Sequence, residues 1–192
     1  TKYGAEQGLN IMQSIPYLTT DQDYTAILTT VKTLQPEAIA LCGTTTDTGL
    51  LVKQIQQLGI DALLVGGTGG YNAKTVEIAG SASEGFLCVG VYVASNPDEK
   101  VQTLVEKYNA AYGEIPDGFA ALSYDQMYVI AYAAKAAMDA NDGTVTRETL
   151  KDALKAINYD GVTGTVTFND VNDWERPYLT LKVENGEFVL DE

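Results

Sequence analysis

Threonines that directly follow two short apolar runs are the residues best placed to contact a ligand. Thr44 and Thr45 come after the first of these runs, and Thr68 lies in the glycine-rich segment after the second. Hydroxyl groups and unpaired N–H groups bind polar solutes, and in a parallel sheet they meet at the carboxyl ends of the strands. We therefore expect Thr44, Thr45 and Thr68 at one edge of a sheet. Tyr71, which follows the glycines, is a further candidate ligand contact.

The composition argues against catalysis and against nucleic-acid binding. The 192 residues contain no histidine and two cysteines, so the usual general base and the Ser-His and Cys-His pairs are absent. The formal net charge of -14 disfavours nucleic acid and anionic membrane surfaces, because binding to phosphate requires clustered Lys and Arg. We expect no catalytic residue, no metal site and no cofactor.

Two segments match known ligand-binding motifs only in part. Segment 68–75 aligns with a phosphate-binding loop, but Thr68 and Ala73 replace both of the required glycines. Segment 169–175 is acidic, yet it lacks the alternating ligands and the central glycine of an EF-hand calcium loop. Nucleotide binding is therefore not expected, and a solvated hairpin loop is the better interpretation of 169–175.

The first half of the chain alternates short apolar runs with helical patterns, which predicts a parallel sheet with helices on both faces. Thr20 or Asp21 can cap the first helix, which Pro36 ends, and Asp47 can cap the next. The expected strands cover residues 9–15, 38–42, 62–65 and 85–92.

Both cysteines lie in these apolar runs, so buried and reduced thiols are expected at Cys42 and Cys88. The strand 62–65 should lie between their two strands. That separation makes a disulfide between them geometrically unfavourable.

After about Ala94 helices predominate, and the chain ends in strands. Thr146 can cap a helix, and the apolar segment 120–141 predicts a long helix that protein surrounds on most sides. Tyrosines at helical spacing are expected in the core, and they are Tyr108, Tyr112, Tyr128 and Tyr132. The final strands are expected at 164–168, 178–184 and 187–190, the last two joined by an Asn-Gly turn.

Several short segments together resemble the branched-chain amino acid binding proteins of ABC transporters, which have the α/β, type I periplasmic-binding-protein fold. The segments keep the order and spacing of that family over nearly the whole chain from residue 9 onward. They are Tyr3-Gly4, Asp23-Tyr24-Thr25-Ala26, Pro36-Glu37-Ala38-Ile39, Lys53-Gln54, Leu58-Gly59, Gly66-Gly67-Thr68-Gly69, Ala79-Gly80, Glu84-Gly85, Tyr108, Tyr112-Gly113, Pro116-Asp117, Ala120-Ala121, Tyr124-Asp125, Gly161-Val162-Thr163-Gly164 and Phe168.

The resemblance implies two lobes that close over a ligand by a hinge. Residues 1–92 and 178–192 would form an incomplete ligand-binding lobe, and residues 93–177 the helical remainder of the other lobe with the crossing segments. Tyr3 corresponds to a cleft tyrosine of the family, and Thr44 stands where the family often has a tyrosine. The strand that should precede Tyr3 is absent, so a further N-terminal part or a complementing chain is an expected partner.

Thr68 is the most consequential departure from the family, which usually has Asp or Glu there to pair with the ammonium group of the ligand. A hydroxyl cannot neutralise a desolvated ammonium group. Either another acid supplies the charge or the ligand is not a simple α-amino acid. Asp47 is near, although its pattern fits a helix cap better.

The resemblance implies a non-enzymatic receptor, periplasmic or extracellular, with a lipid anchor at the cell surface as one option. It would capture an amino acid or related carboxylate and deliver it to an ABC permease. A sensor or regulatory domain of the same fold, without a transporter, is the first alternative. An α/β enzyme of flavodoxin-like or Rossmann-like type is the second, and the absent histidine and broken nucleotide loops argue against it.

Overall fold

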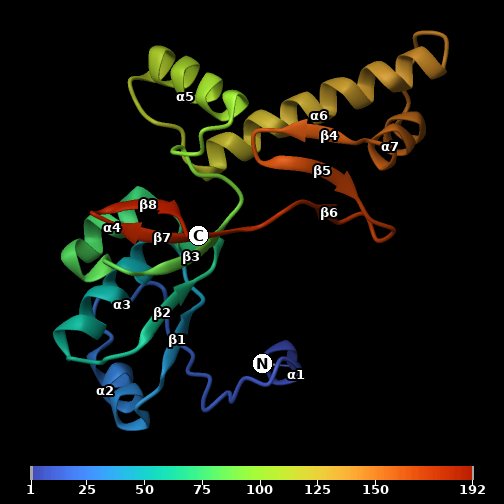
Figure 1. Cartoon of the computed structure of the whole chain (residues 1–192). Coiled ribbons are helices and arrows are strands. Elements are labelled where there is room, and N and C mark those ends of the chain that lie inside the picture. Colours follow the sequence, from blue (N-terminus) through green and yellow to red (C-terminus); the bar gives the residue numbers. More distant parts are fainter. Residues whose placement is uncertain (1, 192) are drawn as a thin grey trace. The chain divides into compact units, whose positions relative to one another are not determined.

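The computed structural model describes residues 2–191, with side chains from residue 4 onward. The chain divides into two compact units (Figure 1). The first consists of Thr1–Val89 and Leu181–Val189, and the second of Gly90–Thr180 and Leu190–Glu192. Each is described separately below.

A five-stranded sheet in the order β1-β2-β3-β7-β8 organises the first unit (Figure 1). Strands β1, β2 and β3 run parallel, with Ala38 opposite Leu63 and Val65 opposite Leu87. The strands are β1 (Ala38–Leu41), β2 (Leu63–Gly66), β3 (Leu87–Gly90), β7 (Leu179–Glu184) and β8 (Glu187–Leu190). The helices are α1 (Lys2–Glu6), α2 (Thr25–Leu34), α3 (Thr45–Gln57) and α4 (Ala73–Ala79), with 3-10 turns η1 (Thr68–Gly70) and η2 (Gly80–Ser83).

Helices cover one face of this sheet in the described part of the chain, whereas the sequence predicted helices on both faces. The buried side chains of α2, α3 and α4 form one cluster with Leu41, Cys88 and Val183 of the sheet. Side chains that alternate to the opposite face are exposed, among them Leu63 (49%) and Val89 (36%). The apolar pattern of the strands predicts that both faces of the sheet are buried. It does not show whether helices of the described chain are available to cover both faces.

The strand predicted at 9–15 does not form. Residues 9–18 have no regular secondary structure, and Leu9, Ile11 and Met12 are 63%, 45% and 52% exposed. A strand requires backbone hydrogen bonds to a neighbour, and no described strand pairs with this segment. The segment therefore has the apolar spacing of a strand but lacks a neighbouring described strand to pair with.

The helix α2 begins later than predicted. Tyr24 occupies the N-cap position, and the Asp23 carboxylate accepts a hydrogen bond from the Thr25 amide at 2.8 Å, in place of a cap at Thr20 or Asp21. Tyr24 is 2% exposed, and its hydroxyl donates a hydrogen bond to the Asp21 carbonyl at 2.9 Å. This bond ties the turn before α2 to the start of the helix. The helix ends before Pro36, as predicted.

Both cysteines are free, and β2 lies between their two strands, as predicted. Cys88 is buried in β3, and its thiol donates to the Gly67 carbonyl at 2.9 Å. Burial raises the pKa of this thiol to about 12. The prediction of a buried thiol is wrong for Cys42, which is exposed because it lies just past the end of β1.

The second unit combines three helices with a three-stranded sheet in the order β4-β5-β6, whose pairs are antiparallel. Asp98, Asp117 and Thr146 each accept a hydrogen bond from an amide in the first turn of the helix that follows. The elements are α5 (Glu99–Tyr112), α6 (Gly118–Ala140), α7 (Arg147–Lys155), β4 (Tyr159–Gly161), β5 (Gly164–Phe168) and β6 (Trp174–Glu175).

Helix α6 is buried along one stripe and not on most sides as predicted. Ala121, Asp125, Val129, Ala133 and Ala137 are buried, at the four-residue spacing of one helix face. The prediction of core tyrosines is wrong for Tyr112, Tyr128 and Tyr132, which are 69%, 40% and 51% exposed, and Tyr108 is half-buried. Small alanines occupy the contact face, so the larger rings lie outside it.

Candidate functional site

The predicted ligand-contacting threonines lie at one edge of the five-stranded sheet. Strands β1 and β2 are parallel and end at Leu41 and Gly66, so the segments that follow them share the carboxyl edge. Thr44 is the N-cap of α3, and Thr68 opens η1. Both residues are exposed at this edge, and the Thr44 hydroxyl donates a hydrogen bond to Asp47.

The two segments touch through Gly69. A Cβ atom at this position would overlap the carbonyl oxygen of Gly43 and would lie 3.6 Å from the Cα of Thr44. Gly67, two residues earlier, has nothing within 4 Å of the corresponding position. The absence of a side chain at Gly69 therefore permits the close approach of the Thr44 and Thr68 segments, and Gly67 has no such role.

A buried carboxylate fixes the Thr44 segment. Asp47 is 0% exposed, and its two oxygens accept hydrogen bonds from the Thr44 amide at 3.0 and 3.2 Å, the Thr44 hydroxyl, and the Tyr17 hydroxyl at 2.6 Å. Burial by itself raises the pKa of the Asp47 carboxyl, but the hydrogen bonds from Thr44 and Tyr17 outweigh it and leave the pKa below its usual value. Asp47 is therefore ionised. The sequence predicted it as the N-cap of α3, but Thr44 holds that position, and Asp47 is the third helical residue, which closes a capping box with Thr44.

Tyr17 completes this arrangement and was not predicted from the sequence. It lies in the irregular segment before α2, and its ring packs edge-on against Tyr24 with the centroids 5.4 Å apart. Burial, with the hydrogen bond to Asp47, raises the pKa of the Tyr17 phenol, which keeps the hydroxyl protonated as a donor. Thirty positions separate Tyr17 from Asp47, so no local pattern could have paired them.

The other predicted ligand contacts, Thr45, Tyr71 and Tyr3, do not lie beside Thr68 in the same way as Thr44. Thr45 is half-buried at the start of α3, and its carbonyl accepts a hydrogen bond from the Thr75 hydroxyl at 3.3 Å. Tyr71 is half-buried and packs edge-on against Phe188, with the centroids 5.0 Å apart, beside the core of the unit. Tyr3 lies in α1, and its side chain is outside the described part. The structure therefore brings together Thr44 and Thr68 more directly than the other candidates.

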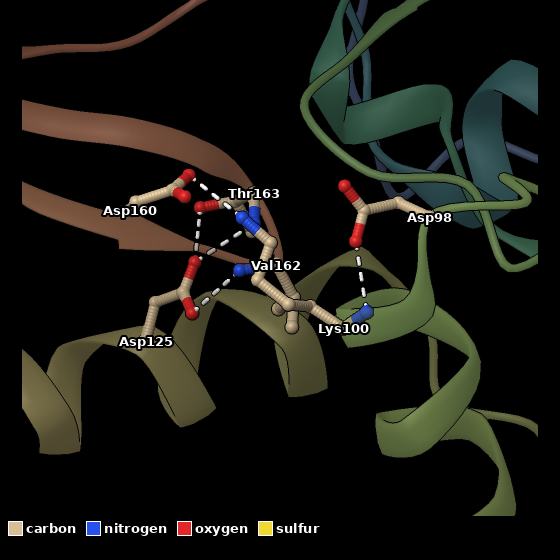
Figure 2. A network of polar contacts seen from close by, with 6 residues as sticks. All are labelled: Asp98, Lys100, Asp125, Asp160, Val162 and Thr163. Carbon is tan, nitrogen blue, oxygen red and sulfur yellow. Dashed lines mark hydrogen bonds and ion pairs between the residues drawn. The ribbon is translucent and has the colours of Figure 1, made fainter.

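A second buried carboxylate, Asp125, lies in the other unit. Figure 2 shows it extending from α6 to the turn between β4 and β5. It accepts hydrogen bonds from the amides of Val162 and Thr163 at 3.0 and 2.8 Å and from the Thr163 hydroxyl. A Cβ atom on Gly161 would overlap this carboxylate, so the glycine permits the approach. Asp125 thereby anchors the hairpin to the helix.

Two cations lie around this turn. Arg176 donates to the Thr163 hydroxyl at 3.2 Å and lies over the Trp174 ring, 4.5 Å from its centroid. Lys100 forms an ion pair with Asp160 at 2.7 Å, which Figure 2 also shows. These contacts hold the turn in place, and none of them involves a residue predicted to bind ligand.

Comparison with known families identifies the chain. Residues 1–187 match the family of periplasmic binding proteins, so the match spans both units. The chain belongs to this family. The resemblance seen in the sequence is thus confirmed, and the match is to binding proteins and not to a family of enzymes.

Curated members of the family include two similar bacterial proteins. The leucine-, isoleucine-, valine-, threonine- and alanine-binding protein of Pseudomonas aeruginosa is 30% identical over 154 residues, which are 80% of this chain and 39% of that protein. A Leu/Ile/Val-binding protein homologue of Brucella melitensis is 28% identical over 173 residues, covering 88% of this chain and 45% of that protein. The chain therefore spans less than half the length of these relatives.

Solved structures of periplasmic binding proteins show the same fold. A leucine-binding protein from Thermotoga maritima superposes with a TM-score of 0.83 at 26% identity, over 94% of this chain and 51% of that one. A solute-binding protein from R. palustris in complex with benzoate gives 0.84 at 19% identity, over 98% and 51%, and supports the fold alone. The predicted α/β fold of this family is confirmed.

Two further properties of the described residues bear on the family membership. None of the described helices combines the length and apolar character needed to cross a membrane. Within residues 2–191, no group of three or more cysteine, aspartate or glutamate side chains is arranged to hold a metal ion.

Proposed function

We propose that this chain is part of a periplasmic or extracellular solute-binding receptor of an ABC transporter. It captures a small polar solute, an amino acid or a related carboxylate, at the carboxyl edge of the five-stranded sheet. The receptor then delivers the solute to the membrane permease. The similar proteins include an amino-acid-binding protein and, as a likeness of fold alone, a solute-binding protein in complex with benzoate, so this fold accommodates solutes with and without an amine.

The observation that carries this proposal is the contact between the two threonine segments. Thr44 and Thr68 are both exposed residues. Asp47 holds the Thr44 segment in place, and the missing side chain at Gly69 lets the Thr68 segment lie alongside it. Hydroxyl groups held in position by the fold lose little conformational entropy on binding a ligand. Closure of two lobes over the solute, which the resemblance implies, remains a prediction.

The test combines ligand identification with a matched pair of glycine variants. Mass spectrometry of the purified full-length protein identifies the retained solute, and calorimetry measures its affinity. Gly69→Ala should weaken binding about tenfold, because the added methyl group must push the two threonine segments apart. Gly67→Ala should leave the affinity unchanged, because its methyl group meets open space. Equal affinities for both variants would place the site elsewhere.

The proposal includes a structural partner for the uncovered apolar surfaces. Leu63 and Val89 are exposed on one face of the sheet, and Ile130 and Met138 are 50% and 45% exposed on α6. We propose that further residues of the same polypeptide, or a complementing chain, cover them. Val129, on the same helix, is buried and needs no such cover. Expressed alone, the 192-residue segment should unfold without a cooperative transition, and a sharp urea curve would contradict this.

A further inference from the structure

The charge at the carboxyl edge decides which class of solute this site accepts. The segments 42–48 and 66–72, which follow β1 and β2, contain one acidic residue, Asp47. The exposed side chains of these segments belong to Cys42, Thr44, Thr46 and Thr68, and none of them carries a carboxylate. Any negative charge that these two segments offer to a ligand must therefore come from Asp47.

Asp47 is not available to a ligand at this edge. Three donors engage its two oxygens: the Thr44 amide, whose single proton is shared between both oxygens, the Thr44 hydroxyl and the Tyr17 hydroxyl. The residue is also 0% exposed, beneath the segment that a solute would contact. Its charge is used within the fold to stabilise the first turn of α3.

We infer that the solute bound at this edge carries no ammonium group and is an amine-free carboxylate. The inference rests on the proposed function, because it concerns the same edge. A desolvated ammonium group without an available carboxylate would be strongly unfavourable. A carboxylate, in contrast, accepts charge-assisted hydrogen bonds from hydroxyl groups and needs no acid here. The Thr68 hydroxyl is an exposed donor at this edge that lies outside the Asp47 network.

The direct test compares leucine with 4-methylpentanoate, which has the same carbon skeleton and carboxylate but lacks the amine. Calorimetry on the full-length protein should show that 4-methylpentanoate binds at least about tenfold more tightly than leucine. Tighter binding of leucine would overturn the inference and leave the proposed receptor function intact. Mass spectrometry of the retained solute gives an independent result, and a retained amino acid would also overturn the inference.

A charge variant tests the same point at the residue itself. Thr68→Asp should tighten leucine binding about tenfold and weaken 4-methylpentanoate binding by a similar factor, because it supplies the absent carboxylate. Thr144→Asp makes the same charge change at an exposed loop of the other unit and should alter neither affinity. An unchanged preference in Thr68→Asp would contradict the inference. If the protein retains no solute and binds neither probe nor any other small carboxylate or amino acid, the proposed function itself fails.

Discussion

Asp47 and Asp125 are both fully buried carboxylates, but they stabilise different kinds of structure. Asp47 bonds mainly to Thr44, three residues earlier in the chain, and adds one long-range bond from Tyr17. All of the bonds to Asp125 come from a turn 37 and 38 residues away. The first carboxylate therefore shapes a helix end beside an exposed hydroxyl, and the second joins a helix to a hairpin.

The difference separates a carboxylate that positions one residue at the proposed ligand edge from a carboxylate that holds two elements together. Removal of Asp47 would release Thr44, which lies at the proposed ligand edge, while the core of the unit keeps its apolar contacts. Removal of Asp125 would leave two buried amides of the β4–β5 turn without acceptors. Unsatisfied buried donors are among the costliest defects in a fold.

The largest expected effect is on the stability of the Asp125 region. Asp125→Asn places an amide donor against the amide or hydroxyl donors of Val162 and Thr163 and removes the charge that they solvate. We expect the free energy of unfolding to fall by about 3 kcal/mol, measured by urea unfolding of the full-length protein. Asp139→Asn, in an exposed ion pair on the same helix, is the control and should change it by less than about 0.5 kcal/mol.

An intermediate effect is expected at Asp47, with a defined pH dependence. Asp47→Asn should lower the free energy of unfolding by about 2 kcal/mol at pH 7, because Thr44 and Tyr17 lose a charged acceptor. The folded pKa lies below the unfolded value of about 3.9, so ionised Asp47 stabilises the protein fully above that value. This stabilisation is lost as the pH falls through the folded pKa.

Urea unfolding of the wild type and the Asp47→Asn variant across pH 2–7 measures this contribution. The stability difference should be constant above about pH 5 and should shrink at lower pH. A difference that grows on acidification would mean that burial raises the folded pKa and that Asp47 is not an ionised cap.

The smallest effect is expected at Lys100, next to the Asp125 network. Its ion pair with Asp160 lies at the surface, where the two side chains are 40% and 72% exposed. Lys100→Met should change the free energy of unfolding by less than about 0.5 kcal/mol, because solvent screens exposed pairs. A loss as large as that of Asp125→Asn would show that the turn depends on the surface pair and not on the buried carboxylate.

The sequence allowed good prediction where hydrogen-bond partners are local. Thr146 precedes its helix with a capping pattern that needs a few residues only, and the Asn185-Gly186 turn is set by its own backbone. The parallel order that places β2 between the two cysteines followed from the alternation of strands and helices. The edge that carries Thr44 and Thr68 could therefore be predicted as well.

The errors arose where the outcome depends on distant or absent neighbours. Residues 9–15 have the apolar spacing of a strand but no described strand to pair with. Tyr17 reaches Asp47 across 30 positions, and the turn that holds Asp125 is farther still, so spacing could not reveal either pair. Cys42 lies one residue beyond the end of β1, and that single position separates a buried thiol from an exposed one.

The most direct test of the proposed binding edge is a crystal structure of the full-length protein with its retained solute. We predict that a polar atom of the solute lies about 3 Å from the hydroxyl oxygen of Thr44 or Thr68, at the carboxyl ends of β1 and β2. A solute bound at the amino ends of these strands, or with no contact to either threonine, would contradict it.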